Sequence, residues 1–200
     1  MIKTLTCFLL FNFFVFGFIP NDTVKAKIAI LHKAGEIYNS LKTKDRLRAG
    51  EMLRVFVLPA NPPGADCFVY VVHSGSKESF LLCKTQLKSK QDTLLLPNSD
   101  DYYIFDEAGV KERITIFCSA KKINEIEKLF AMSELAPSSS WNEVETKLIA
   151  LNKSNLNETS DKPFPLAGNV SAVNDDFIES MQLFVGKDML IRKYEIEVKK

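Results

Sequence analysis

Six short segments of strand-forming residues recur between residues 50 and 120, and this rhythm limits the fold more than any other feature of the chain. Clusters of glycine, proline, asparagine and aspartate separate the segments, and these residue types favour turns. Short strands at spacings of roughly ten residues are typical of a sandwich or a barrel. The segments are Met52–Leu58, Cys67–Val72, Ser79–Cys83, Thr93–Leu96, Tyr102–Phe105 and Arg113–Cys118.

The pattern changes from strands to helices over residues 121–152. Ile123, Ile126 and Phe130 recur at the spacing of one helix face. A second apolar stripe follows, and both stripes are the kind that docks a helix on a domain. The second stripe consists of Trp141, Val144, Leu148 and Leu151. These residues predict a two-helix insertion, and the polar residues after them predict a loop over 153–175.

The C-terminus returns to a strand pattern and predicts a hairpin over 177–198. Met181–Val185 and Met189–Val198 are the two strands, joined by a turn at Gly186–Asp188. In the second strand three apolar residues alternate with three charged ones, which indicates one buried and one solvated face. The apolar residues are Tyr194, Ile196 and Val198, and the charged ones are Lys193, Glu195 and Glu197.

The fold prediction is a mostly β (α+β) protein. Residues 27–200 are expected to form a single β-rich domain. It is an antiparallel β-sandwich of about seven to nine strands, with the two helices inserted before the C-terminal hairpin. The last strand is expected to complete the sheet that begins near residue 50.

Residues 1–26 have the pattern of an export signal. Lys3 precedes an apolar run from Leu5 to Ile19, and Val24–Ala26 resembles the small-x-Ala pattern that signal peptidases recognise. The run is shorter than the ~20 apolar residues of a membrane-spanning helix. We therefore expect cleavage after Ala26, a periplasmic or secreted protein, and no stable membrane span; an uncleaved N-terminal anchor is the alternative.

The charge of the chain argues against a nucleic-acid partner. The whole chain carries a formal net charge of +1, and removal of Lys3, Asp22 and Lys25 with the signal brings it to zero. Nucleic-acid binders usually show a basic face. The net charge gives no support for an anionic membrane surface as a partner either.

A set of strand and turn positions recurs between residues 45 and 120 and covers about 75 of the 200 residues. The positions are Leu47–Glu51, Cys67–Val71, Gly75, Leu95–Pro97 and Gly109–Arg113 leading to Ser119–Ala120. On these positions the segment resembles the bacterial Domain of Unknown Function 4384 family. The resemblance implies a β-rich module of exported or envelope proteins, with no established activity and no catalytic residues.

The stretch from Cys67 to Cys83 holds the candidate chemistry. His73 is one of two histidines and lies beside Ser74 and Ser76. The glycine pattern of a nucleophile elbow is missing, and a serine or cysteine triad on His73 would need an acid such as Asp100 or Asp106 from elsewhere in the fold. The histidines and cysteines lack the paired spacing of a zinc site, so no metal and no cofactor is predicted.

The cysteines that follow the signal are Cys67, Cys83 and Cys118. A hairpin centred on Gly75 would place Cys67 opposite Cys83, where a disulfide could close. Three buried thiols are the alternative.

The sequence therefore predicts a non-enzymatic exported envelope module. Its partner would be an envelope protein or a cell-wall component, bound by the β-sandwich. A secreted hydrolase using His73 with a serine or cysteine nucleophile is the alternative, and a subunit that donates its C-terminal strand to a partner sheet is a third.

Overall fold

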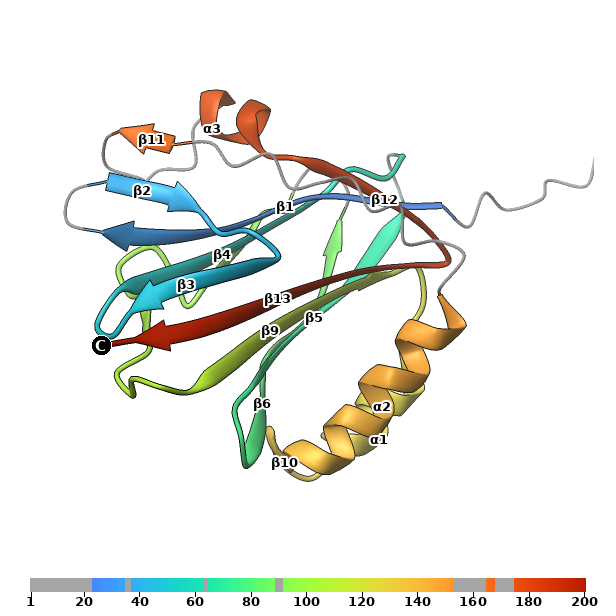
Figure 1. The fold of residues 1–200 in the computed structure, drawn as a ribbon. Helices are drawn as coiled ribbons and strands as arrows, with labels where there is room; N and C mark the ends of the chain where they lie inside the picture. The colour runs from blue at the N-terminus through green and yellow to red at the C-terminus, as the bar shows by residue number, and fades with distance from the viewer. Residues whose placement is uncertain (1–22, 35–36, 63–64, 89–91, 153–164, 168–174) are drawn as a thin grey trace, which may run out of the picture.

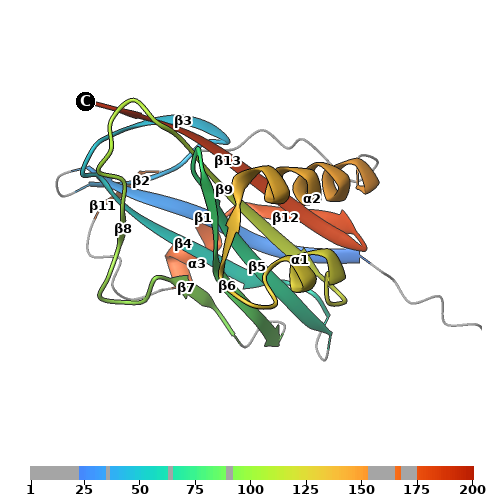
Figure 2. The same cartoon turned by 90° about the horizontal axis from the view of Figure 1, so that it is seen from below.

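The computed structural model describes residues 23–34, 37–62, 65–88, 92–152, 165–167 and 175–200. Within them two β-sheets pack face to face, and three helices lie on the outer faces of the sheets (Figures 1 and 2). This arrangement confirms the predicted mostly β, α+β sandwich. The six strands predicted between residues 50 and 120 are all present, as β4 to β9.

Sheet A runs in the order β11-β2-β1-β4-β7, with β12 beside β1 and β8 beside β4. Its strands are β1 (Thr23–Ala34), β2 (Ile37–Ser40), β4 (Met52–Pro59), β7 (Leu94–Leu96), β8 (Tyr103–Ile104), β11 (Pro165–Ala167) and β12 (Leu183–Lys187).

Sheet B runs in the order β10-β6-β5-β9-β13-β3. Its strands are β3 (Lys44–Arg48), β5 (Asp66–Ser74), β6 (Glu78–Lys88), β9 (Lys111–Ser119), β10 (Leu135–Pro137) and β13 (Met189–Lys199). The described residues thus form thirteen strands. This exceeds the seven to nine predicted because β1 to β3 and the short β10 and β11 had not been assigned.

The core between the sheets is built from alternate residues of facing strands. Leu53, Val55 and Val57 of β4 are fully buried there, as their alternation predicts. Facing them are apolar side chains of β5, β9 and β13. The predicted inward face of the last strand is also confirmed, since Tyr194, Ile196 and Val198 are all buried in this core.

Helices cover parts of both outer faces. α3 (Asp175–Ser180) packs Phe177 on Phe56 of sheet A, ring centroids 4.7 Å apart. α1 (Asn124–Leu129) and α2 (Ser138–Leu151) pack on sheet B around Trp141 and Phe117. The two helices therefore lie where the predicted insertion at 121–152 places them. Most of the loop predicted at 153–175 lies outside the described residues, although β11 falls inside it.

The predicted C-terminal hairpin is wrong. Residues 177–180 belong to α3, and β12 and β13 belong to different sheets: β12 pairs with β1, and β13 pairs with β9. The turn between them is a corner at which the chain crosses the sandwich. Asp188 has a positive φ of 61° there, a conformation that aspartate adopts more readily than most residues.

Two related expectations change with this corner. β13 does not extend the sheet that contains β4, and its pairing with β3 is parallel, an exception to the predicted antiparallel order. β13 also has β9 on one side and β3 on the other. Over Glu195–Glu197 both edges of β13 are therefore paired within the chain, so donation of this part to a partner sheet would require displacement of β9 or β3.

The predicted signal boundary falls inside a strand. Residues 1–22 lie outside the described part, but Thr23 to Ala26 are the first four residues of β1. Val24 and Ala26 are completely buried, and this stretch pairs with β12. Export itself stays a prediction, whereas cleavage after Ala26 would remove part of the core.

A chain that begins at Lys27 should be less stable than one that begins at Thr23. It loses four of the five residue pairs between β1 and β12, and it loses the buried side chains of Val24 and Ala26. We expect a loss of about 3 kcal/mol in the free energy of unfolding, which corresponds to burial of a valine with its neighbours. Urea denaturation of the two chains measures the difference, and equal midpoints would contradict the expectation.

Candidate functional site

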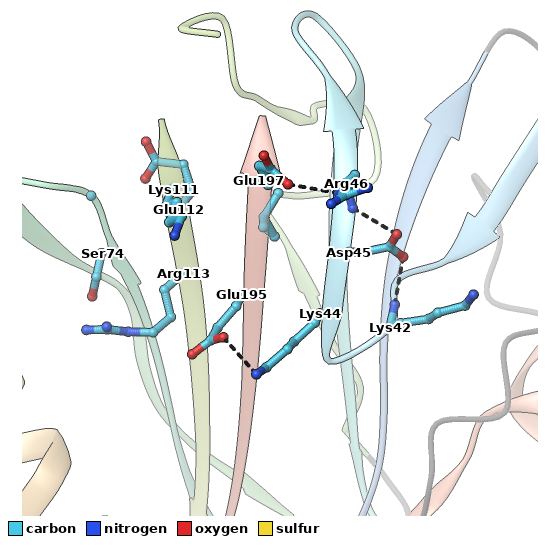
Figure 3. Close-up of a pocket in the computed structure, with 12 residues that line it drawn as sticks. Lys42, Lys44, Asp45, Arg46, Ser74, Lys111, Glu112, Arg113, Glu195 and Glu197 are labelled. Carbon is cyan, nitrogen blue, oxygen red and sulfur yellow. Dashed lines mark hydrogen bonds and ion pairs between the residues drawn. The ribbon is translucent and has the colours of Figure 1, made fainter. Parts of the chain in front are cut away.

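Part of the outer face of sheet B carries none of the described helices. α1 and α2 cover the part near the start of β13, while the end of β13 near the C-terminus is left open (Figures 1 and 2). In the open part, strands β9, β13 and β3 form the floor of a hollow of about 690 Å³ (Figure 3). We call this hollow the charged groove. Its lining residues are Lys42, Lys44, Asp45, Arg46, Ser74, Gly75, Lys111, Glu112, Arg113, Glu195, Ile196 and Glu197.

Strand register explains how the charges are ordered. Glu195 of β13 lies between Lys44 of β3 and Arg113 of β9. Two residues further along, the same arrangement repeats with different residues. The two rows across the strands are Arg113, Glu195 and Lys44, and then Lys111, Glu197 and Arg46. Each row is therefore basic, acidic, basic, with the acid on the central strand.

The two central carboxylates are engaged by neighbouring cations. Glu195 is 3.2 Å from Lys193 and 3.8 Å from Lys44, and Glu197 is 2.8 Å from the guanidinium of Arg46. The last two of these pairs are drawn in Figure 3.

The two other acids of the groove are also engaged. Asp45 accepts hydrogen bonds from the backbone N–H groups of Lys42 at 3.0 Å and Arg46 at 2.9 Å. The Glu112 carboxylate is 2.8 Å from the imidazole of His73. All four acidic side chains of the groove thus have partners.

The lysines at the two sides of the groove differ from the acids. Among the residues that the structure describes, the ammonium groups of Lys42 and Lys111 form no ion pair. Figure 3 shows these two residues on opposite sides of the groove. The charged groups of the groove that remain available to a ligand are therefore these two ammonium groups, which are positive.

A buried carboxylate on α2 fixes the helix side of the groove. Glu145 is 3% exposed, lies 3.2 Å from Arg113 and 4.0 Å from Lys193, and accepts a hydrogen bond from the Thr115 hydroxyl. A buried carboxylate needs such partners, because burial without them is costly. Glu145 therefore holds Arg113 in place and joins α2 to the groove floor.

His73 lies near the groove but faces the other side of sheet B. Its ring stacks on Phe105 at 5.3 Å and on Phe80 at 6.2 Å, and its Nε2 atom contacts Glu112. Glu112 was not among the acids considered from the sequence, since Asp100 and Asp106 had been named instead. Neighbours on a strand point to opposite faces, so Ser74 is directed away from His73.

Of the two serines named beside His73, Ser74 belongs to a separate hydroxyl cluster with Ser79 and Ser138. The Ser79 hydroxyl donates to Ser74 at 3.1 Å and lies 3.2 Å from the Ser138 hydroxyl, which donates to the Gly75 carbonyl. Within the described residues, none of these serines is hydrogen-bonded to His73. Within the described residues, Ser74 is thus engaged by other hydroxyl groups and not by His73.

The predicted pairing of Cys67 with Cys83 is corrected by the register of β5 and β6. Cys67 lies opposite Leu87, and Cys83 lies opposite Val71. The three described cysteines are free thiols, and burial raises the pKa of Cys83.

Two features of the hairpin cause this shift. The last registered pair is Ser74 with Ser79, so the turn is not centred on Gly75. A bulge between Val71 and Val72 then shifts the pairing by one further residue. The thiol that contacts Cys67 is that of Cys118 on β9.

Three further observations bear on the class of site. Among the described helices, none combines the length and hydrophobicity of a membrane span. The described residues contain no cluster of three or more histidine, cysteine, aspartate and glutamate side chains that could hold a metal ion. No family model, curated protein or solved structure matches the chain. The resemblance of residues 45–120 to the Domain of Unknown Function 4384 family stays a prediction.

Proposed function

We propose that the protein is a non-enzymatic exported module of the bacterial envelope, and that its charged groove binds anionic groups of an envelope protein or a cell-wall component. Export rests on the signal pattern of residues 1–26. The ligand class rests on one observation: the acids of the groove have partners, whereas the ammonium groups of Lys42 and Lys111 form no ion pair within the described part of the chain.

The arrangement favours a ligand with two separated anionic groups. Lys111 begins β9 and Lys42 precedes β3, and β13 lies between these strands. Adjacent strands are about 4.8 Å apart, so two strand spacings separate the backbones of β9 and β3 by roughly 10 Å. A single small anion would reach one lysine, while an extended acidic chain would reach both.

The strength of such binding can be bounded. Exposed ion pairs contribute about 0.2–1 kcal/mol each, and salt screens them. Two pairs alone give weak, salt-sensitive binding, so hydrogen bonds from the groove floor must add to the affinity. Weak binding is sufficient for a module that meets a polymer with many repeated charges, because multivalency raises the overall affinity.

Replacing both lysines by glutamate should abolish most of the binding. For Lys42→Glu combined with Lys111→Glu, we expect the affinity for poly-L-glutamate to fall at least about tenfold, since two attractions become two repulsions. Fluorescence anisotropy of labelled poly-L-glutamate at low and physiological salt measures the change, and inorganic polyphosphate of matched charge tests phosphate against carboxylate.

Lys121→Glu combined with Lys122→Glu is the matched control. Both lysines are exposed and follow the opposite end of β9, beyond Ser119. The two substitutions together carry the same change of charge outside the groove. An equal loss of binding in the control, or no binding of either polyanion by the unaltered protein, would overturn the proposal.

A further inference from the structure

Two thiols lie together in the core, apart from the charged groove. Cys67 and Cys118 are both completely buried between the sheets. They belong to β5 and β9, which are adjacent antiparallel strands. Their side chains are neighbours, and each thiol affects the pKa of the other.

The register defines their relation more closely. Val69 lies opposite Cys118, so Cys67 is the diagonal neighbour of Cys118 on the same face of the sheet. The side chains of diagonal neighbours on one face are within reach of each other, although their backbones are further apart than those of direct pairs. A disulfide needs α-carbons within about 7 Å, so closure requires a small approach of the two strands.

The position within the strands makes this approach feasible. Cys67 is the second residue of β5, and Cys118 is the last but one of β9. Both therefore lie at the same end of the β5–β9 pairing, whose last registered pair is Phe68 with Ser119. The contact between the two thiols shows that the side chains already point toward one another.

We propose that Cys67 and Cys118 form a disulfide when the protein folds in an oxidising compartment. The oxidant is a disulfide-bearing thiol oxidant. The thiolate of one cysteine attacks it, which gives a mixed disulfide and releases one thiolate. The other cysteine then loses its proton and attacks the sulfur of the first, which releases the second thiolate. Two protein thiols are oxidised, and the disulfide of the oxidant is reduced to two thiols.

In the folded core, the neighbouring Cys118 lowers the pKa of Cys67, while Cys67 and burial raise the pKa of Cys118. Because both thiols are inaccessible in the finished core, the oxidant has to reach them before the sheets close or during transient opening.

The inference depends on the proposed export only for the place where the oxidant is met, and it does not involve the groove. An exported protein folds where disulfides persist. The link would close a long loop and tie two inner strands of sheet B together. Such a link should stabilise the fold mainly by restricting the unfolded chain.

The test is refolding of the full chain from urea in a glutathione buffer, with and without excess oxidised glutathione. Free thiols are then alkylated, and peptide mass mapping identifies the linked residues. We expect a Cys67–Cys118 link in the oxidised sample, and a higher urea midpoint than in the reduced sample. Mapping of the unaltered chain decides the question even if a variant fails to fold.

Three alanine variants complete the test. Cys83→Ala is the matched control and should still form the link, whereas Cys67→Ala and Cys118→Ala should not. Absence of the link in the unaltered chain under excess oxidant would overturn the proposal, as would a link from Cys67 to Cys83 in its place. Neither result touches the groove, so the proposed ligand binding is tested separately.

Discussion

Replacing Gly186 by alanine is expected to lower the free energy of unfolding by about 3 kcal/mol or more, because there is no room for a β-carbon at this corner. An added Cβ would lie 2.2 Å from the Met189 carbonyl oxygen and 2.9 Å from its carbonyl carbon. These are backbone atoms at the start of β13 and cannot rotate away as a side chain can. The substitution therefore forces apart the two strands that connect sheet A to sheet B. Thermal unfolding followed by circular dichroism measures the loss.

Gly109→Ala is the control that distinguishes the steric effect of an added Cβ from the effect of backbone conformation. Gly109 has a positive φ of 85°, and an added Cβ meets nothing within 4 Å. The expected loss in the free energy of unfolding therefore comes only from holding alanine in the left-handed backbone conformation, and it is about 1–2 kcal/mol. A loss at Gly186 no larger than at Gly109 would show that the corner adjusts easily, and the explanation from close packing would be wrong.

The same corner shows what local sequence cannot reveal. Gly186–Lys187–Asp188 has the composition of a hairpin turn, and the apolar residues on both sides alternate as in a hairpin. Whether the following strand folds back on β12 or crosses to the other sheet depends on partners far away in the chain. β12 pairs with β1, and β13 pairs with β9, contacts that no local pattern encodes.

The predictable part of the fold is the part with one buried and one solvated face. In β4 and β13, alternation identified the core positions because the sandwich buries one face of each strand. β3 offers no such pattern, since only Leu47 among its five residues is buried. Its place beside β13, about 150 residues away in the chain, comes from tertiary structure alone.

The candidate site divides in the same way. The charged face of β13 was visible in the sequence, as Lys193, Glu195 and Glu197 alternate with apolar residues. The cations of β3 that complete the rows were not, because that strand had not been predicted. The disulfide register failed for a related reason: the turn is not centred on Gly75, a bulge at Val71 shifts the pairing further, and nothing in the residue types marks either feature.

Trp141→Ala should be the most destabilising single change on the helical side of the molecule. The indole is completely buried, edge-on to Phe117 at 5.8 Å and beside Phe130 at 5.9 Å. Truncation of a buried tryptophan to alanine costs about 3–5 kcal/mol through lost contacts and the cavity left behind. Circular dichroism is the appropriate measurement, since the variant lacks the only tryptophan of the chain.

Trp141→Phe is the matched control for Trp141→Ala. Within the described residues the indole N–H has no hydrogen-bond partner, so phenylalanine loses volume but no hydrogen bond, and the cost should be much smaller.

The cluster around Trp141 includes Tyr70 and Phe117 of sheet B, so the alanine variant should unfold in one cooperative transition at a lower temperature. If the helices melt first and the sheets remain folded, α1 and α2 are instead a separable addition. Glu145 would then hold Arg113 at the groove only while the helices are folded, and binding of poly-L-glutamate would change at that first transition.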